Sequence, residues 1–568
     1  MEATHAATDV AEKIRQAQTF RGTPPEAFPS RYPNIATLLA ERARASPEAP
    51  YLVTYPDEES RREWTYAAFW ERVCRAANAF SGLGIGKGDR VATLCVNEDA
   101  TVVTYLAALS LGAVVVPLNP GEDDARARYV LEHAQAKLLV HRPDFGERAV
   151  HLTDGLDNLR QRIVTGSRPG ADAPCLDDLT AAASAKPPDL SAPGLGDEAI
   201  IVYTSGTTGE PKGVVLCHRN LLADIEGMAR WHRIGSEDRL MCVLPIHHVN
   251  GMVVTLLTPI WCGASVVLNR KFRTETFWKR LSSERVQIVS VVPTLLQYLL
   301  QEPGGVSEFD LSSFRHLICG AGPLTVELAS SFEEKFGCRI VHGYGLSETT
   351  CYSSFLPIDL PASEHRRWMR DSGFPSIGLA ISPNEMAIHD ESGQPLGPGQ
   401  RGEIVIRGHN VMLYYFRRPE ANAETFKNGW FRSGDEGFFE TDSQGCPNYF
   451  ITGRLKELII RGGVNLSTFE VDEVLMHIPG VRCGLAVGFE NTWYGEEVGA
   501  YVVPEEGASL DAESILAHCR KVLPFAKAPK VVVFGSDVPA TSTGKYQRTR
   551  LKHHFKAYRE TQFRDPSR

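Results

Sequence analysis

The sequence predicts an α/β protein that is built from several domains. Its 568 residues exceed the size at which a single hydrophobic core stops growing. Short apolar runs alternate with helical patterns up to about residue 380, which is typical of parallel sheets with crossover helices. Beyond that point the apolar runs become hairpin-like, and a compact α+β segment follows a short charged break. We therefore expect a large α/β region followed by smaller units.

The alternation is clearest from residue 90 onward. The run RVATLCV is expected to form a strand, TVVTYLAALSL a helix and GAVVVPL a second strand. Similar apolar runs return in AIIVYTS, LMCVLP, ASVVL, VQIVSVVP, LICGAG and CRIVHGYG. We expect these runs to be strands of parallel sheets.

The two ends of the chain differ from this pattern. Residues 1–33 are polar, end in a Pro/Gly-rich stretch and are expected to form a loose N-terminal arm. The strand-like runs EMAIHD and EIVIRG, separated by ESGQPLGPGQRG, predict a small antiparallel or barrel-like subdomain. The segment ITGRLKELIIRGG at 451–463 is short and charged, so we expect a hinge or a domain boundary there.

The composition excludes several classes of protein. A hydrophobic content of 43% and a charged content of 23% are ordinary for a soluble globular protein. A net charge of −9 argues against general nucleic-acid binding, which needs a basic surface. Twelve scattered cysteines without a C-x-x-C pair indicate a reducing compartment, not a disulfide framework or a zinc site. The N-terminus lacks the apolar core of a signal peptide and no long apolar run is present, so we expect a cytoplasmic protein without stable membrane insertion.

The most distinctive local sequence is YTSGTTGEPKGV at 203–214, which follows an apolar strand. Gly206 and Gly209 allow close approach of the backbone, and the neighbouring hydroxyls suit phosphate oxygens. The hydroxyls belong to Thr204, Ser205, Thr207 and Thr208. The spacing differs from that of a Walker P-loop, and local composition alone fits a mobile surface loop equally well.

Four later segments also place glycine and polar residues after strands or in turns. They are CGAGPL (319–324), HGYGLSETT (342–350), WFRSGDEG (430–437) and STGKYQR (542–548). Each segment alone is typical of a structural turn. Open α/β sheets bind ligands at the carboxyl ends of their strands, so together the segments indicate one site.

In this order and spacing, the motifs resemble those of the adenylate-forming superfamily. This superfamily includes acyl-CoA synthetases, aryl-CoA ligases, peptide-synthetase adenylation domains and beetle luciferases. The resemblance rests on YTSGTTGEPKGV, GYGLSE, SGD, GRLKELI and TGK, and it extends over roughly residues 34–555. It implies an adenylation domain at 34–455, made of two α/β subdomains plus a small β-barrel, hinged to a mobile α+β C-terminal domain at 456–568.

The resemblance also implies a reaction. Members of the superfamily convert a carboxylic acid into an acyl-adenylate by attack on the α-phosphate of ATP held with Mg²⁺, and a thiol then displaces AMP. We therefore expect an ATP-dependent acyl-CoA synthetase whose cofactors and co-substrates are ATP, Mg²⁺ and CoA. Charge grows on phosphate oxygens during the first step, so the site needs backbone N–H groups, a cation and a metal ion.

The site residues carried over by the resemblance fall into groups. The phosphate group comprises Thr204, Ser205, Gly206, Thr207, Thr208 and Lys212, with Glu348 and Thr207 as metal ligands. The adenine group comprises Gly320, Ala321, Gly322, Gly343, Tyr344 and Gly345, and the ribose group Asp435 and Arg454. Lys545, Glu348 and His248 are expected to be catalytic, with Lys545 neutralising the α-phosphate and the attacking carboxylate. Lys456 is the expected hinge residue, and Arg461, Gly462 and Gly463 are expected to approach the thiol.

The segment LPIHHVNG at 244–251 matches the superfamily's pattern around His248, although His247 departs from the usual aromatic residue. Members that activate amino acids carry an aspartate at the position of His248. A neutral histidine cannot replace that carboxylate as the partner of an ammonium group, so we do not expect an α-amino acid as substrate.

The acid is expected to be a bulky hydrophobic monocarboxylate: fatty, aromatic or polycyclic. The resemblance places its pocket at Met252, Val292 to Thr294, Cys319, Gly320, Gly345 and Cys351 to Ser353. These are mostly small or soft side chains, consistent with a roomy apolar cavity. No arginine or lysine in these segments could neutralise a second carboxylate.

Two alternatives remain open at the level of the sequence. Thr468 stands where a proline is common and Ala526 where an aromatic residue is frequent, so the acceptor could be a carrier-protein phosphopantetheine instead of CoA. An acyl-AMP ligase would then replace the acyl-CoA synthetase. A catalytically silent nucleotide-binding protein is the alternative from another class. The sequence does not fix the oligomeric state, and a homodimer is one alternative.

Overall fold

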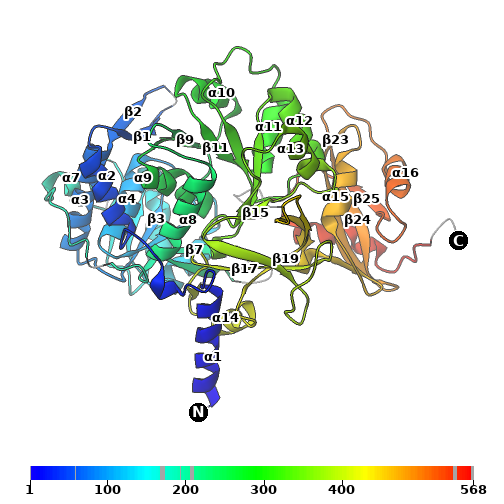
Figure 1. The fold of residues 1–568 in the computed structure, drawn as a ribbon, viewed down its shortest axis with the longest axis horizontal. Helices are drawn as coiled ribbons and strands as arrows, with labels where there is room; N and C mark the ends of the chain where they lie inside the picture. Colours follow the sequence, from blue (N-terminus) through cyan, green and yellow to red (C-terminus); the bar gives the residue numbers. More distant parts are fainter. Residues whose placement is uncertain are drawn as a thin grey trace.

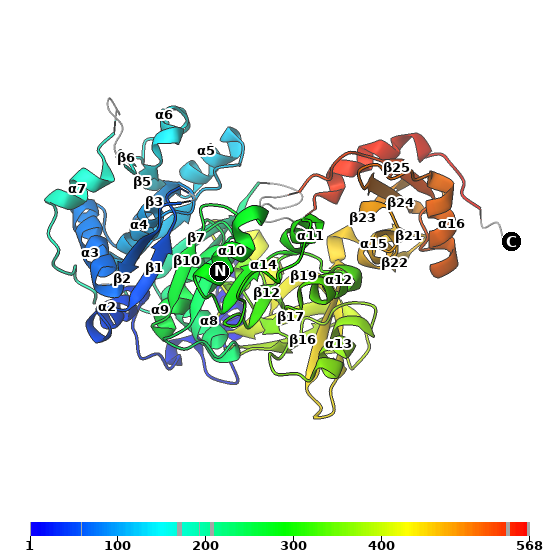
Figure 2. The ribbon, with the colours of Figure 1, turned by 90° about the horizontal axis from the view of Figure 1, so that it is seen from above.

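The computed structural model describes residues 2–57, 59–166, 173–191, 193–204, 210–540 and 546–564. A large body carries the N-terminal residues and a smaller body carries the C-terminal residues, and the two lie side by side (Figures 1 and 2). The large body contains sheets of seven, nine and four strands, and the small body a sheet of five strands. The predicted α/β architecture with a smaller α+β unit is confirmed.

The seven-stranded sheet has the order β18-β8-β7-β4-β3-β5-β6. Its strands are β3 (Arg90–Leu94), β4 (Val114–Pro117), β5 (Ala136–His141), β6 (Gln161–Val164), β7 (Glu198–Thr204), β8 (Lys212–Cys217) and β18 (Tyr414–Tyr415). The parallel part runs from β6 to β7, and β8 turns back antiparallel to β7. The helix predicted between the first two of these strands is α4 (Asp99–Ser110), and every residue of it is buried. Near this sheet lie α3 (Tyr66–Gly82), α5 (Asp124–His133), α6 (Gly146–Thr153) and α7 (Leu176–Ala182).

The nine-stranded sheet has the order β15-β14-β13-β12-β11-β9-β10-β1-β2. Its strands are β1 (Pro50–Thr54), β2 (Arg62–Thr65), β9 (Arg239–Cys242), β10 (Ser265–Leu268), β11 (Ile288–Val291), β12 (His316–Cys319), β13 (Ile340–Tyr344), β14 (Ser354–Phe355) and β15 (Leu379–Ala380). The six strands from β1 to β13 in this order pair in parallel, as the apolar runs predict.

The helices associated with this sheet follow its strands along the chain. They are α8 (His218–Trp231), α9 (Thr258–Cys262), α10 (Thr274–Ser283), α11 (Pro293–Gln301), α12 (Val326–Phe336) and α13 (Ala362–Arg370). The segment Asn250–Leu257 forms a π-helix (η3), and all its residues are buried.

The predicted hairpin is confirmed, and it belongs to a four-stranded antiparallel sheet. Its strands are β16 (Asn384–His389), β17 (Gly402–Gly408), β19 (Phe431–Thr441) and β20 (Pro447–Arg454). Helix α14 (Pro419–Thr425) lies between β17 and β19 in the chain. The four strands form an open sheet and not a regular small barrel. Tyr449 on the outer strand β20 forms one isolated β-bridge with Gly378.

The small body begins after a single 3-10 turn, η5 (Leu455–Glu457), at the predicted hinge. Its strands are β21 (Ile459–Arg461), β22 (Val464–Leu466), β23 (Val481–Asn491), β24 (Gly495–Pro504) and β25 (Val531–Phe534). Its helices are α15 (Thr468–Met476), α16 (Ala512–Val522) and the 3-10 helix η6 (Arg548–Tyr558). The domain boundary at 455/456 stays a prediction, and this element order is compatible with it.

The N-terminal arm is not loose, contrary to expectation. Helix α1 (Glu2–Ala17) projects from the large body in Figure 1, and the residues after it are docked. The Gln18 side-chain amide donates a hydrogen bond to the carbonyl of Met412 at 2.7 Å. Phe28 and Tyr32 are buried ahead of α2 (Ile35–Ala45). Aromatic side chains within the polar stretch therefore fix it to the large body.

Among the described residues, no helix combines the length and apolarity that a membrane span requires.

Candidate active site

The phosphate-loop motif closes a hairpin between β7 and β8. Thr204 at the end of β7 pairs with Lys212 at the start of β8, in antiparallel register. The hairpin therefore holds the two ends of the loop next to each other. The predicted residues Ser205, Gly206, Thr207 and Thr208 lie outside the described residues.

Lys212 and Glu348 both contact Tyr415. The Lys212 ammonium is 4.7 Å from the centre of the Tyr415 ring, and the Tyr415 hydroxyl donates a hydrogen bond to Glu348 Oε1 at 2.8 Å. Burial lowers the pKa of Lys212, and the nearby positive charge of Lys456 lowers it further. The structure thus brings together the predicted phosphate lysine, the predicted metal carboxylate and the predicted hinge lysine.

Glu348 lies in the short 3-10 turn η4 (Ser347–Thr349), just after the end of β13. Its backbone carbonyl accepts a hydrogen bond from the Met412 amide at 2.8 Å, which fixes the turn. In the described part of the chain, no three His, Cys, Asp or Glu side chains form a self-sufficient metal site. A single buried carboxylate fits Mg²⁺, because proteins hold this ion with one or two carboxylates plus substrate phosphates and water.

Asp435, Tyr344 and Arg454 form the predicted nucleoside group. The Tyr344 hydroxyl donates a 2.6 Å hydrogen bond to Asp435 Oδ2, and Arg454 Nε lies 3.0 Å from Asp435 Oδ1. Asp435 on β19 and Arg454 on β20 are direct cross-strand partners, so the sheet register creates this pair. The negative charge of Asp435 raises the pKa of Arg454, and burial raises the pKa of Tyr344.

One oxygen of Asp435 remains available to a ligand. The side chain is 1% exposed, and its Oδ1 accepts no well-aligned hydrogen bond despite the close guanidinium. Buried carboxylate oxygens normally accept hydrogen bonds, and ribose hydroxyls are suitable donors. The environment of Asp435 therefore fits its predicted role.

Close packing requires three of the four glycines in the adenine motifs: Gly320, Gly343 and Gly345. A Cβ atom on Gly320 would lie 2.6 Å from the carbonyl oxygen of Gly343. A Cβ atom on Gly345 would lie 1.9 Å from the carbonyl oxygen of Cys351. Ala321, between the two glycines of the 320–322 loop, has a φ of +64°, a strained value for a residue with a side chain. These loops follow β12 and β13 directly, so the two adenine segments lie side by side.

His248 lies beside the phosphate hairpin, as the predicted catalytic role requires. His247 and His248 have ring centres 4.4 Å apart and line a cavity of about 450 Å³. The other wall of this cavity includes Asn119, Arg126, Tyr203, Thr204 and Pro211. Burial holds the pKa of His247 well below its usual value, so this imidazole is neutral at pH 7.

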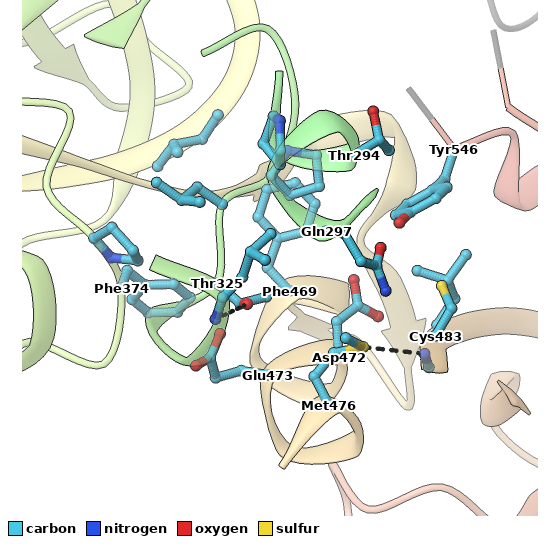
Figure 3. A pocket seen from close by; sticks show the side chains of 18 of the residues that line it. Thr294, Gln297, Thr325, Phe374, Phe469, Asp472, Glu473, Met476, Cys483 and Tyr546 are labelled. Carbon is cyan, nitrogen blue, oxygen red and sulfur yellow. Dashed lines mark hydrogen bonds between the residues drawn. The ribbon is translucent and has the colours of Figure 1, made fainter. Parts of the chain in front are cut away.

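A second cavity, of about 710 Å³, lies between the two bodies (Figure 3). The large body contributes Thr294, Leu324 and His342, among others. The small body contributes Phe469, Asp472, Glu473, Cys483 and Tyr546. The predicted catalytic Lys545 lies outside the described residues, but its neighbour Tyr546 is part of this cavity wall. His342 is a wall residue that was not predicted as part of the site, although it directly precedes the Gly343–Tyr344 pair.

The predicted roomy acid pocket stays a prediction. Six of its residues are almost fully buried: Met252 (2% exposed), Val292 (5%), Cys319 (0%), Cys351 (5%), Tyr352 (2%) and Ser353 (0%). Of the predicted lining, Pro293 and Thr294 belong to the larger of the two cavities described above. Small side chains alone do not create a cavity, because the side chains around them can fill the space.

Arg461 does not extend toward a thiol site in this arrangement. Its Nε lies 2.7 Å from Glu497 Oε1 inside the small body, and Lys530 Nζ lies 3.3 Å from the same oxygen. Gly462 and Gly463 have φ values of +57° and +82°, and they form the two-residue turn between β21 and β22. Arg461 anchors this turn, while the two glycines form its exposed end.

Comparison with known proteins gives concordant matches over almost the whole chain. Residues 39–416 match the family described as "AMP-binding enzyme", and residues 470–545 match its C-terminal domain. A sulfoacetate–CoA ligase of Cupriavidus necator is 34% identical, covering 94% of this chain and 99% of its own length. A feruloyl-CoA synthase of an Amycolatopsis species is 33% identical, covering 92% of this chain and 100% of its own length.

Solved structures show the same architecture. ATP-bound MatB from Rhodopseudomonas palustris superimposes with a TM-score of 0.82 at 28% identity, covering 93% of this chain and 100% of MatB. Apo MatB, with the same identity and coverage, gives a TM-score of 0.72. The fold, the grouped motifs and the two family matches lead to one conclusion: this chain belongs to the family of AMP-binding enzymes, within the adenylate-forming superfamily.

Proposed function

We propose that this protein is an ATP-dependent acid–thiol ligase, which activates a carboxylic acid as acyl-AMP and transfers the acyl group to CoA. The observation that carries the proposal is the buried Asp435, with one oxygen free for a ribose and Tyr344 and Arg454 on either side. The relatives supply the reaction class, because several of them are named CoA ligases or CoA synthases.

The nucleoside end of ATP would be held by the large body. Asp435 would accept hydrogen bonds from the ribose hydroxyls, with the Arg454 guanidinium beside it. Tyr344 and the 320–322 loop flank the adenine. His342, Leu324 and Ile451 extend this region into the cavity between the two bodies, which would accommodate the edge of the base.

The phosphate end would lie between the hairpin and the turn that carries Glu348. Lys212 supplies positive charge to the phosphate oxygens, and the hydroxyls and amides of the loop supply hydrogen bonds. Glu348, together with Thr207, would hold Mg²⁺, which neutralises phosphate charge when bound. Tyr415 keeps the Glu348 carboxylate in place through its hydroxyl.

The proposed reaction has two steps, and each forms one bond and breaks another. An oxygen of the substrate carboxylate forms a bond to the α-phosphorus, and the bond from that phosphorus to the bridging oxygen breaks, releasing pyrophosphate. The thiolate sulfur of CoA then attacks the acyl carbon, and AMP leaves with the carboxylate oxygen. Lys545 would stabilise the negative charge of the first step, in agreement with the position of Tyr546 at the cavity.

The arrangement of the two bodies favours the first half-reaction. Tyr546, next to Lys545, is near the nucleotide region, whereas Val464 beside the Gly462–Gly463 turn is 58% exposed. The higher TM-score to ATP-bound than to apo MatB supports the same assignment. The second half-reaction would require the small body to rotate about the turn at Lys456.

The named relatives favour CoA over a carrier protein as the acceptor. They do not agree on the size of the acid. Their names include both a small acid, sulfoacetate, and a bulky one, ferulate. The proposed bulky hydrophobic acid depended on a roomy pocket, and the burial of the six pocket residues weakens that part of the proposal.

Pyrophosphate release with MgATP tests the proposal, across a panel of carboxylic acids with and without CoA. We expect acid-dependent release, and acyl-CoA as the product identified by mass. Acyl-AMP that accumulates in the presence of CoA would instead support a carrier-protein ligase. ATP binding without turnover of any acid would support the silent nucleotide-binding alternative.

A further inference from the structure

Tyr352 fills the space behind the carboxyl ends of β12 and β13. Its side chain is almost fully buried, and its hydroxyl oxygen lies 2.7 Å from the position that a Cβ atom on Gly320 would take. The ring packs on Phe355 with 4.4 Å between ring centres. The ring therefore occupies the interior beside the 320–322 loop.

A chain of buried polar groups holds this ring in place. The Asn250 amide donates a hydrogen bond to the Tyr352 hydroxyl at 3.1 Å, and the Ser290 hydroxyl donates to Asn250 Oδ1 at 2.7 Å. Asn250 begins the π-helix η3 and Ser290 lies on β11, so two separate elements position the ring. Rotating the ring out would leave the buried Asn250 amide without this partner, which is unfavourable.

The position of Tyr352 matters because of where the acid must bind. The ribose group at Asp435 and the phosphate group at Lys212 and Glu348 fix the two ends of ATP. The attacking carboxylate must reach the α-phosphate between them, at the carboxyl ends of the strands. An acyl group that extends from there into the sheet region, between η3 and the loops after β12 and β13, meets the Tyr352 ring.

We propose that Tyr352 sets the depth of the acid pocket, and that the enzyme consequently selects short acids over bulky hydrophobic ones. This inference rests on the proposed function and replaces the bulky acid expected from the sequence. Pockets discriminate by fit: one methylene group in an apolar pocket is worth about 1–3 kcal/mol, or roughly 10–200-fold in kcat/KM. A fixed ring rejects longer acids more strongly, because they would have to displace it.

Three variants test the inference. Tyr352→Ala removes the ring, Tyr352→Phe removes only the hydroxyl, and Tyr66→Ala is the matched control. Tyr66 is likewise fully buried and hydrogen-bonded, to the Ala264 carbonyl at 2.7 Å, but it lies in α3 away from the site. The measurement is kcat/KM for pyrophosphate release with acetate, propionate, butyrate, oxalate and sulfoacetate, against octanoate, benzoate and cinnamate. Thermal unfolding shows whether each variant is folded. Tyr352→Leu replaces Tyr352→Ala in the measurement if the alanine variant does not fold.

We expect the wild type to prefer one or more of the short acids, and Tyr352→Ala to raise the ratio of long-acid to short-acid kcat/KM by about 10-fold or more. Tyr352→Phe and Tyr66→Ala should keep the wild-type ratio. The inference is overturned if the wild-type kcat/KM for octanoate, benzoate or cinnamate equals or exceeds that for its best short acid. Binding of the acid in the cavity at His247 and His248 would give this result. It is also overturned if a folded Tyr352→Ala or Tyr352→Leu variant keeps the wild-type ratio. If no acid on either list gives release with the wild type, the proposed function fails together with the inference.

Discussion

At the residue scale, the account depends on Asp435 as the acceptor of the ribose hydroxyls. This carboxylate is buried, keeps one oxygen without a well-aligned donor and lies beside the Arg454 guanidinium. Hydrogen bonds to charged groups contribute about 1.5–3 kcal/mol, so Asp435→Asn should weaken AMP binding by roughly 10–150-fold. Calorimetric titration with AMP measures this. Asp442→Asn, in the exposed turn of the same hairpin, is the control and should bind AMP like the wild type. Equal affinity in both variants would remove Asp435 from the ribose site.

Lys545 carries the second prediction at this scale. If its charge stabilises the attack on the α-phosphate, Lys545→Ala should slow adenylation by about 10²–10³-fold and leave thioester formation from supplied acyl-AMP intact. Single-turnover assays of each half-reaction separate the two steps. Lys552→Ala, which removes an exposed lysine paired with Glu496, should change neither. An equal loss in both half-reactions of Lys545→Ala would contradict the assigned role.

Some features of individual residues could be predicted from the sequence, and others could not. The strand ends and the close-packed glycines were predictable from the local sequence, whereas the role of Asp435 was implied only by the resemblance of its motif. The burial of Tyr352 was not, because it depends on Asn250 and Ser290, which lie far from it in the sequence. The docking of the N-terminal arm through Gln18 and Met412 escaped prediction for the same reason. Contacts between distant segments leave no local pattern in one sequence.

At the element scale, the β21–β22 hairpin depends on a buried charge cluster. Arg461 and Lys530 share the carboxylate of Glu497, which is itself fully buried. Burial lowers the pKa of Lys530 to about 8, so this amine is still mostly charged at pH 7 and below. Glu497 therefore balances two cations beneath the Gly462–Gly463 turn, and the cluster fixes the direction in which the turn projects.

Removing Arg461 should destabilise the small body strongly. Arg461→Ala removes one of the two cations that pair with the buried Glu497 carboxylate and leaves Lys530 as the other, so it should cost about 1.5–3 kcal/mol in the free energy of unfolding. Arg520→Ala, which breaks an exposed pair with Glu513, should cost at most about 1 kcal/mol. Hydrogen exchange of β21 to β25 provides the measurement. Similar protection in the two variants would show that the cluster does not hold the hairpin.

At the scale of the whole molecule, the interface between the two bodies contains a carboxylate with a shifted pKa. Glu473 on α15 accepts hydrogen bonds from the Val326 amide at the start of α12, with its two oxygens at 3.0 and 3.3 Å. Burial raises its pKa to about 7, although this amide and nearby His477 act in the opposite direction. His477 also lies 3.6 Å from Glu327 of the large body, so both side chains face the interface.

The sign of the pH effect follows from the raised pKa. The docked arrangement holds a proton on Glu473 more strongly than the undocked one, so docking is favoured at low pH. This advantage falls as the pH rises from about 4.5 to about 7, and it is constant above that range. Small-angle scattering between pH 5 and 8 should show a looser particle at the upper end, and Glu473→Gln should reduce the change. A pH response that is identical in Glu473→Gln would exclude Glu473 as its source.

The most direct test of the central claim follows the oxygen atoms of the acid. If the substrate carboxylate attacks the α-phosphorus, an acid labelled with ¹⁸O in both carboxyl positions should give AMP with one ¹⁸O and acyl-CoA with the other. Mass spectrometry of the two products after turnover with MgATP and CoA, using the best acid of the panel, measures this. Unlabelled AMP, or ADP with ¹⁸O in inorganic phosphate, would show that the acid is not activated as an adenylate and would contradict the account.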